Sequence, residues 1–177
     1  MAMAPQLLHT PRLRLRPPRP HDAEAIFSRY AADAEVTRYL SWPRHRTLND
    51  TRAFLEWSAA AWRRDGVGPY LIYREDDLIG STGLQCMAGE RALTGYVLAR
   101  DAWGQGYATE VLRGMMELAQ TCGLRELEAI CHARHRASQR VLEKCGFQPV
   151  RDSNQPFPNL IPAMQPAHIF ILCIARP

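Results

Sequence analysis

The sequence predicts a mixed α+β fold with a mostly antiparallel central sheet. Apolar runs at residues 70–73, 78–84 and 93–98 are separated by polar turns at 74–77 and 88–90, as in consecutive hairpins. Over residues 108–122, apolar side chains recur at spacings of three and four, which is typical of an amphipathic helix. The length of 177 residues suits a single domain, residues 1–177, with a full hydrophobic core.

The N-terminal third predicts one strand followed by helices. Residues 10–16 alternate leucine with arginine, as a half-buried strand does, and a run of prolines ends it. Asp22 is expected to cap a helix that reaches residue 32, and a second short helix is expected over residues 34–40. A longer helix, capped by Asn49 or Asp50, should run to residue 64. Its expected core-facing side chains are Phe54, Trp57, Ala61 and Trp62.

The C-terminal third predicts two further strands around a helix. Residues 124–131 are expected to form a strand, and residues 137–145 a helix that ends at Gly146. Four prolines between residues 152 and 167 indicate a loop. Residues 168–174 are expected to form a buried closing strand.

Composition narrows the class of protein. The chain is 46% hydrophobic and 23% charged, with a net charge of +4, which suits an anionic ligand but is too small for a nucleic-acid tail. Its five cysteines are scattered and odd in number, so we expect free thiols in a reducing cytoplasm and no metal site. The first ten residues do not resemble a signal peptide, and no apolar run approaches the roughly 20 residues of a membrane span. We therefore expect a cytoplasmic protein without membrane or nucleic-acid partners.

The most informative stretch is the strand, turn and helix over residues 95–123. The turn, Trp103-Gly104-Gln105-Gly106-Tyr107-Ala108, is rich in small residues and leads directly into the amphipathic helix. The first amides of a helix lack partners within it and its dipole favours negative charge, so such a turn suits an anion. The turn lacks the lysine and Ser/Thr of a nucleotide P-loop and the glycine spacing of a dinucleotide-binding fold. An ordinary glycine-rich turn is the alternative interpretation.

A second motif makes the first more specific. Residues 135–147 read His-Arg-Ala-Ser-Gln-Arg-Val-Leu-Glu-Lys-Cys-Gly-Phe. By itself, this segment is a capped amphipathic helix. Together, the two motifs resemble the GNAT superfamily of acyl-CoA-dependent N-acyltransferases, whose turn reads [Q/R]xxGx[G/A] and whose later helix often reads NxxSxxxxEKxGF. The opening TPRLRLRPP and the segment WGQGYATE are similar to the ribosomal-protein N-terminal acetyltransferases (RimJ/RimL-like).

The resemblance implies a sheet that splays at its centre, with helices on both faces and acetyl-CoA in the split. Backbone groups of the strand that ends at Val97, Leu98 and Arg100 would meet the pantetheine arm. The amine acceptor would lie beneath a roof formed by residues 42–55 and 157–167, with Trp42 in its pocket. The diphosphate would bind the amides of Gln105, Gly106, Tyr107, Ala108 and Thr109.

The resemblance also implies direct attack of a neutral primary amine on acetyl-CoA in a ternary complex, without a metal. The acceptor is either a protein N-terminus or a small molecule, and the oligomeric state, monomer or homodimer, stays open. Many relatives carry a tyrosine acid where this chain has Leu142. Ser138, one turn earlier, can donate to the thiol or cap its helix. His132 can act as a base or be an exposed loop histidine.

Other residues leave alternatives open. His135 stands where relatives often have a pantetheine-binding asparagine, so it inherits that contact with different geometry. Arg134, Arg136 and Arg140 are interpreted either as contacts to the 3′-phosphate of coenzyme A or as a solvated helix face. Because several family residues are replaced, a non-catalytic acyl-CoA-binding module remains the alternative to an N-acetyltransferase.

Overall fold

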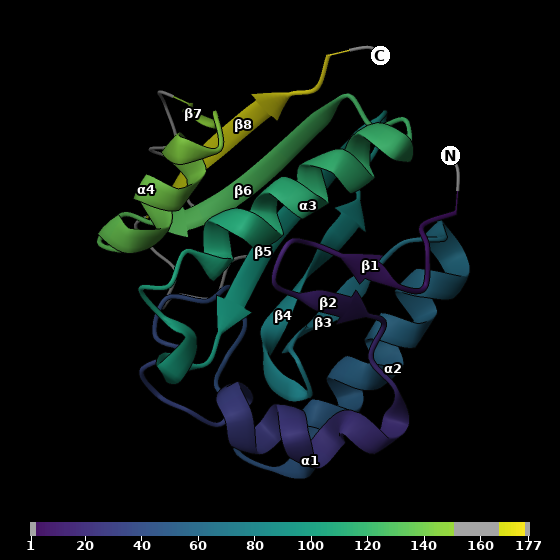
Figure 1. The fold of residues 1–177 in the computed structure, drawn as a ribbon, viewed down its shortest axis with the longest axis vertical. Coiled ribbons are helices and arrows are strands. Elements are labelled where there is room, and N and C mark those ends of the chain that lie inside the picture. Colours follow the sequence, from purple (N-terminus) through teal and green to yellow (C-terminus); the bar gives the residue numbers. More distant parts are fainter. Residues whose placement is uncertain (1–2, 151–166, 176–177) are drawn as a thin grey trace.

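The computed structural model describes residues 3–150 and 167–175, and its centre is one sheet (Figure 1). In the described residues the sheet has eight strands in the order β1-β2-β3-β4-β5-β6-β8-β7. Every neighbouring pair is antiparallel except β5 and β6. The strands are β1 (Leu8–His9), β2 (Arg14–Arg16), β3 (Pro69–Arg74), β4 (Asp77–Cys86), β5 (Arg91–Leu98), β6 (Glu126–His132), β7 (Gln148–Pro149) and β8 (Ala167–Cys173). The predicted mixed fold with a mostly antiparallel sheet is confirmed.

Helices cover both faces of the sheet. One face packs against α3 (Tyr107–Thr121) and α4 (Arg136–Lys144), and the other packs against α1 (Ala23–Ile26), the π-helical turn η2 (Phe27–Ala31) and α2 (Leu48–Asp65). Side chains alternate between faces along a strand. In β3, Tyr70 and Ile72 therefore join the core under α3, whereas Leu71 and Tyr73 join the core under α1.

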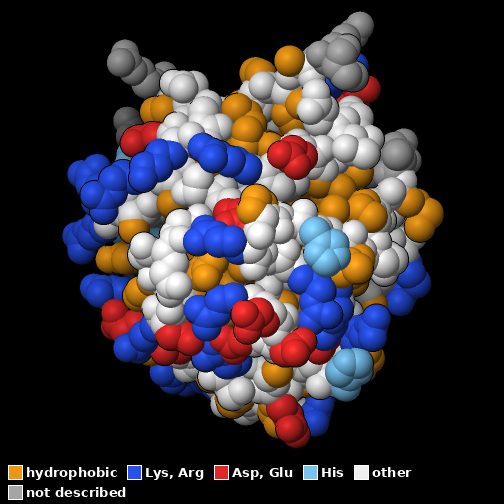
Figure 2. All heavy atoms as spheres, in the orientation of Figure 1, with side chains coloured by type: hydrophobic (Ala, Val, Ile, Leu, Met, Phe, Trp, Pro, Cys, Tyr) orange, Lys and Arg blue, Asp and Glu red, His pale blue; other side chains and the backbone are white. Residues whose placement is uncertain are grey.

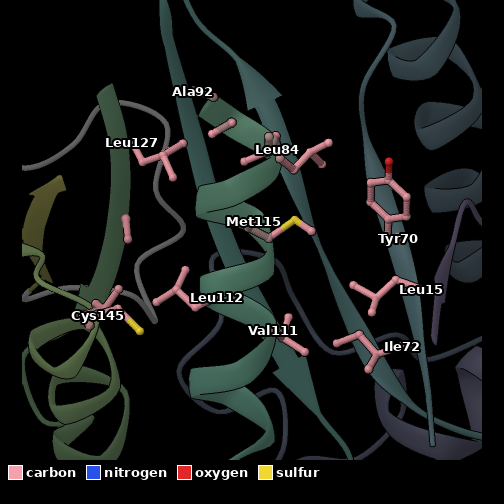
Figure 3. Close-up of a cluster of buried hydrophobic side chains, with 14 of the residues drawn as sticks. Leu15, Tyr70, Ile72, Leu84, Ala92, Val111, Leu112, Met115, Leu127 and Cys145 are labelled. Carbon is pink, nitrogen blue, oxygen red and sulfur yellow. The ribbon is translucent and has the colours of Figure 1, made fainter. Parts of the chain in front are cut away.

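The larger core forms under the apolar stripe of α3. Val111, Leu112 and Met115 are fully buried. In Figure 3, Leu112 points toward the side of Leu127 and Cys145, whereas Val111 and Met115 point toward the side of Ile72 and Tyr70. The predicted helical spacing is confirmed. Because this helix is fixed over the sheet, the turn at its N-terminus is fixed too.

The N-terminal third differs from the prediction in its details. The strand expected over residues 10–16 is a short β1–β2 hairpin, and residues 34–40 form turns, so the short helix expected there is wrong. Thr47, rather than Asn49 or Asp50, is the N-cap of α2, and Asp50 accepts hydrogen bonds from the amides of Arg46 and Thr47. Asp22 is the N-cap residue of α1, as predicted, but its carboxylate accepts the side chain of Arg16 and the amide of Arg19 instead of the first amides of α1.

The C-terminal third follows the prediction more closely. Strand β6 and helix α4 lie within two residues of their expected bounds, and β8 is confirmed, although only Ala167 and Phe170 of this strand are buried. The predicted loop at residues 152–166 lies outside the described residues.

The sheet splits at its centre, where β5 and β6 run parallel. These strands pair only from Arg91 with Glu126 to Leu93 with Glu128, whereas β5 pairs with β4 along its whole length and β6 pairs with β8 to its end. Figure 1 shows β5 and β6 diverging toward their carboxyl ends. From Thr94 and Ala129 onward, each strand therefore presents an edge without a sheet partner to the gap.

Two surface properties accompany this fold. Acidic and basic side chains alternate across the lower half of the face in Figure 2, so this part of the surface has no single sign. Among the described residues, no helix combines the length and apolar character needed to cross a bilayer.

Candidate active site

A cavity of about 570 Å³ occupies the split and continues to the α1–α2 face. Its inner wall comes from the diverging strands, including Gly95, Tyr96 and Cys131, and from Ser138 and Leu142 of α4. Its outer wall comes from residues 39–57, including Trp42 and Phe54. The cavity therefore connects the α4 side of the sheet with the α1–α2 side, and two substrates could meet inside it.

The register of β4 and β5 determines which backbone groups face the split. The amide of Ala99 donates to the carbonyl of Ile79 at 2.8 Å, so these residues form a directly hydrogen-bonded antiparallel pair. Because such pairs alternate, Val97 bonds toward β4, whereas the amides and carbonyls of Tyr96 and Leu98 point toward the split. Two of the strand residues predicted to meet pantetheine are therefore at the split. Leu98 directs its backbone amide toward it, and Val97 contributes its side chain to the cavity wall.

The turn before α3 presents a row of unused amides. Gly104 and Gly106 have φ values of 73° and 80°, a region that side-chain-bearing residues avoid. Gly106 is the N-cap of α3, and no side chain caps this helix. In the part of the chain that the structure describes, the amides of residues 105–109 donate no hydrogen bond. The predicted turn thus has the amide donors and the helix dipole that an anion needs.

A partly buried carboxylate holds this turn against the β1–β2 hairpin. Glu110 accepts hydrogen bonds from the Thr10 hydroxyl at 2.6 Å, the Arg12 amide at 2.8 Å and the Arg12 guanidinium at 2.7 Å. The same guanidinium donates to the carbonyl of Gln105 at 3.0 Å. Burial opposes ionisation of Glu110, but the bonds from Thr10 and Arg12 outweigh it and lower its pKa. The clamp thereby fixes the backbone of the turn.

Tyr96 is a site residue that the sequence analysis missed. Its hydroxyl lies 3.0 Å from the hydroxyl of Ser138, across the split from α4. Burial raises the pKa of Tyr96, and the hydrogen bond with Ser138 only partly offsets this. The phenol is therefore protonated at neutral pH. A tyrosine beside a glycine in the middle of an apolar strand was the available signal.

Cys131 lies beside the same pair on the cavity wall. Burial raises the pKa of its thiol, and a hydrogen bond with Ser138 opposes that rise without cancelling it. The thiol is thus protonated at neutral pH, which makes it a poor nucleophile. All five cysteines are free.

The two predicted histidines stack against Tyr39. The Tyr39 ring centroid lies 4.8 Å from that of His132 and 4.9 Å from that of His135. His132 is buried at the end of β6 and accepts the amide of Arg134 on Nδ1, so the exposed-loop interpretation is wrong. His135 borders the cavity, and burial, together with the charge of His132, lowers its pKa. His135 is therefore neutral at pH 7 and able to accept a proton.

A search against protein-family models matches residues 12–148 to the acetyltransferase (GNAT) domain. The chain belongs to the GNAT acetyltransferases. Among curated relatives, the uncharacterized N-acetyltransferase YoaA of Bacillus subtilis is 33% identical over 147 residues, covering 80% of this chain and 82% of YoaA. The uncharacterized N-acetyltransferase p20 of Bacillus licheniformis is 26% identical, covering 81% and 83%. The chain is accordingly an acyl-CoA-dependent acetyltransferase.

Solved GNAT structures share the fold. A RimL ribosomal-protein alpha-N-acetyltransferase in complex with coenzyme A superimposes with a TM-score of 0.81 at 18% identity, covering 95% of this chain and 98% of that one. The microcin self-immunity acetyltransferase MccE, in complex with acetyl-CoA and AMP, gives 0.78 at 16% identity, covering 97% and 98%. The predicted resemblance to RimJ/RimL-like enzymes is confirmed for the fold.

The remaining predicted residues of this GNAT enzyme lie at three places. Trp42 is on the outer cavity wall, as expected for the acceptor side. The side chain of Arg100 pairs with Asp33 at 2.8 Å, so that guanidinium is engaged within the protein. Arg134, Arg136 and Arg140 are exposed near the start of α4. In the described residues, no group of three histidine, cysteine or acidic side chains is placed to hold a metal.

Proposed function

We propose that this enzyme transfers an acetyl group from acetyl-CoA to a neutral primary amine by direct attack in a ternary complex. The split between β5 and β6 carries the proposal, because its cavity is lined from both faces of the sheet. The diphosphate binds the amides of residues 105–109, and the pantetheine arm follows the free edge of β5. The acceptor enters from the opposite face, beside Trp42.

Within the split, a backbone amide acts on the thioester carbonyl and a pair of side chains acts on the leaving sulfur. The amide of Leu98 polarises the thioester carbonyl as negative charge develops on its oxygen. The Tyr96–Ser138 pair donates a hydrogen bond to the departing sulfur. A phenol whose pKa lies above its usual 10 transfers a proton poorly to a thiolate, whose thiol has a pKa of about 8.5. The pair therefore stabilises the thiolate by hydrogen bonding. The proton that finally neutralises the thiolate is the one that the amine loses to the base and that the base then passes on.

A proton acceptor is needed as the amine forms its bond to carbon. His135 borders the cavity three residues before Ser138, and its lowered pKa leaves the imidazole neutral at pH 7. We assign it the role of removing the amine proton, directly or through water. His132 does not border the cavity in the described structure, so we assign it the support of His135 through Tyr39.

The cofactor site is tested with Thr109→Glu and its matched control Thr109→Gln. Residue 109 is the third of α3, where a glutamate folds back to the N-cap amide and also favours the helix dipole. Thr109→Glu should therefore keep or raise the melting temperature yet weaken acetyl-CoA binding at least about tenfold, since its charge occupies the diphosphate site. Thr109→Gln should bind more tightly than the glutamate variant. Equal dissociation constants for the two variants in calorimetry would refute the assignment of this turn.

A further inference from the structure

The outer wall of the cavity is aromatic because α2 contributes Phe54 and Trp57 to it. Helix α2 buries Thr51, Leu55, Ser58 and Ala61 against the protein. It turns Phe54 and Trp57 toward the cavity, with ring centroids 6.1 Å apart, and Trp57 remains 44% exposed. A helix that packed only for stability would bury the aromatic side chains and expose the hydroxyls.

This orientation costs stability. The hydroxyl of Ser58 is buried and finds no hydrogen-bond partner among the described residues, and leaving such a group unpaired is unfavourable. The exposed indole of Trp57 also keeps apolar surface in water. Both costs are explained if the aromatic face of α2 binds a ligand.

Trp42 completes the aromatic wall and is held in place. Its ring centroid lies 5.0 Å from that of His45. The backbone amide of His45 donates to the Ala31 carbonyl at 3.0 Å, and its Nδ1 lies 2.9 Å from the Thr51 hydroxyl. The indole of Trp42 is therefore positioned before a ligand arrives, which reduces the entropy that binding must remove.

Basic side chains surround this wall without bordering the cavity, and their repulsion at longer range disfavours a second cation on the ligand. Over residues 38–57, the exposed Arg38, Arg44, Arg46 and Arg52 outnumber Asp50 and Glu56. Asp50 borders the cavity, but its Oδ2 accepts the amides of Arg46 and Thr47 and the Thr47 hydroxyl at the start of α2. The negative charge of Asp50 is therefore partly compensated by these three donors at the start of α2.

We propose that the acceptor is a primary amine that carries an aromatic ring and no second positive charge, with the ring bound against Trp42, Phe54 and Trp57. This inference rests on the proposed function, because the amine must reach the Tyr96–Ser138 pair while its substituent fills the outer cavity. The amine itself must be neutral to attack, so the aromatic wall contacts the substituent rather than an ammonium group. Stacked or edge-on ring contacts favour an aromatic substituent over an aliphatic one.

The test compares amino-acid amides that share one reacting amine. Steady-state acetylation is measured with the amides of phenylalanine, leucine, alanine and lysine. The phenylalanine amide should have a kcat/KM at least about tenfold above the alanine amide, given typical aromatic contact energies, with the leucine amide between them. The lysine amide should be no better than the alanine amide. Equal values for the phenylalanine and alanine amides, or a preference for lysine, would overturn the inference.

Variants assign the preference to the wall. Trp42→Ala and Trp57→Ala should each reduce the phenylalanine-to-alanine ratio by at least about threefold, while Trp57→Phe should retain most of it. The control Leu7→Ala removes a similarly exposed apolar side chain that does not border the cavity and should leave the ratio unchanged. A ratio that survives both alanine variants would refute the aromatic site.

A binding measurement separates this inference from the proposed function. If no amine is acetylated, the proposed function fails, and calorimetry on the coenzyme A-bound protein then decides the inference by itself. Tighter binding of the phenylalanine amide than of the alanine amide supports the aromatic site, and equal or absent binding of the two overturns it.

Discussion

Replacing Glu110 with glutamine should destabilise the protein and loosen the turn before α3. The carboxylate accepts three hydrogen bonds from Thr10 and Arg12, and Arg12 in turn holds the carbonyl of Gln105. Glutamine has the same shape but carries no charge and only one acceptor oxygen. Its amide group would face the guanidinium of Arg12, two donors against each other, so the clamp opens at the turn.

The structure sets the size of this effect. The side chain of Glu110 is 11% exposed, whereas that of Arg12 is 47% exposed. The ion pair itself therefore contributes less than about 1 kcal/mol, because solvent screens it. The bond from the Thr10 hydroxyl is partly buried, and weakening a hydrogen bond to a charged group costs about 1.5–3 kcal/mol. We expect a loss near 2 kcal/mol, which lowers the melting temperature by about 4–8 °C in a chain of this length.

The effect should depend on pH with a definite sign. Folding lowers the pKa of Glu110, so the stabilisation is fully present above the unfolded pKa of about 4.3 and is lost as pH falls through the lower folded value. The difference in unfolding free energy between wild type and Glu110→Gln should thus be constant near pH 7 and shrink below pH 4.3. Urea unfolding at several pH values measures it.

The control is Glu117→Gln, an exposed glutamate two turns further along the same helix. This variant should change the unfolding free energy by less than about 0.5 kcal/mol. In parallel, calorimetry should show weaker acetyl-CoA binding for Glu110→Gln and unchanged binding for the control. A Glu110→Gln protein as stable as wild type at pH 7, or one whose deficit is no smaller at pH 3 than at pH 7, would refute the clamp.

Three further variants examine the chemistry. Tyr96→Phe should lower kcat by about 10- to 100-fold, without removing an ionisation from the pH profile, because the phenol acts as a hydrogen-bond donor; a lost ionisation would instead make it an acid. In the wild type, kcat/KM should fall on the acid side below pH 6.5, because burial lowers the pKa of His135. His135→Gln should abolish this fall, and an unchanged acid limb would exclude His135 as the base. Gly95→Val should raise KM for the amine but leave acetyl-CoA binding unchanged, since a Cβ at Gly95 meets no heavy atom within 4 Å and projects into open space. Weaker acetyl-CoA binding in that variant would contradict this division of the cavity.

Sequence patterns predicted the strands and the long helices because those signals are local. The period of two in β3 to β5 and the period near 3.6 in α3 both follow from which face a side chain buries. The split is different, because it depends on where β5 and β6 stop pairing, and those strands are separated by the whole of α3. No local pattern at Thr94 or Ala129 encodes that point. Only the family resemblance predicted it.

The same distinction explains why Ser138 was found and Tyr96 was not. Ser138 stands in a helix motif that can be recognised from consecutive residues. Tyr96 lies in an apolar run, where a tyrosine is ordinarily a core side chain. Its hydroxyl acquires a partner only because α4 crosses the free edge of β5. A pair formed across 42 residues is a property of the fold and is invisible to spacing within either element.

The rotation of α2 connects the main error of the sequence analysis to the acceptor site. Helical spacing placed Trp57 in the core, but the structure buries Thr51, Leu55 and Ser58 and leaves Trp57 exposed at the cavity. Ala61 is buried, and Phe54 and Trp62 pack against the core as expected, so Trp57 alone was wrongly assigned. Hydrophobicity alone cannot distinguish an aromatic side chain that packs against a sheet from one that lines a cavity. An aromatic side chain that a helix leaves exposed at a cavity therefore favours a ligand that covers it. This observation is the basis on which we propose an aromatic amine as the acceptor.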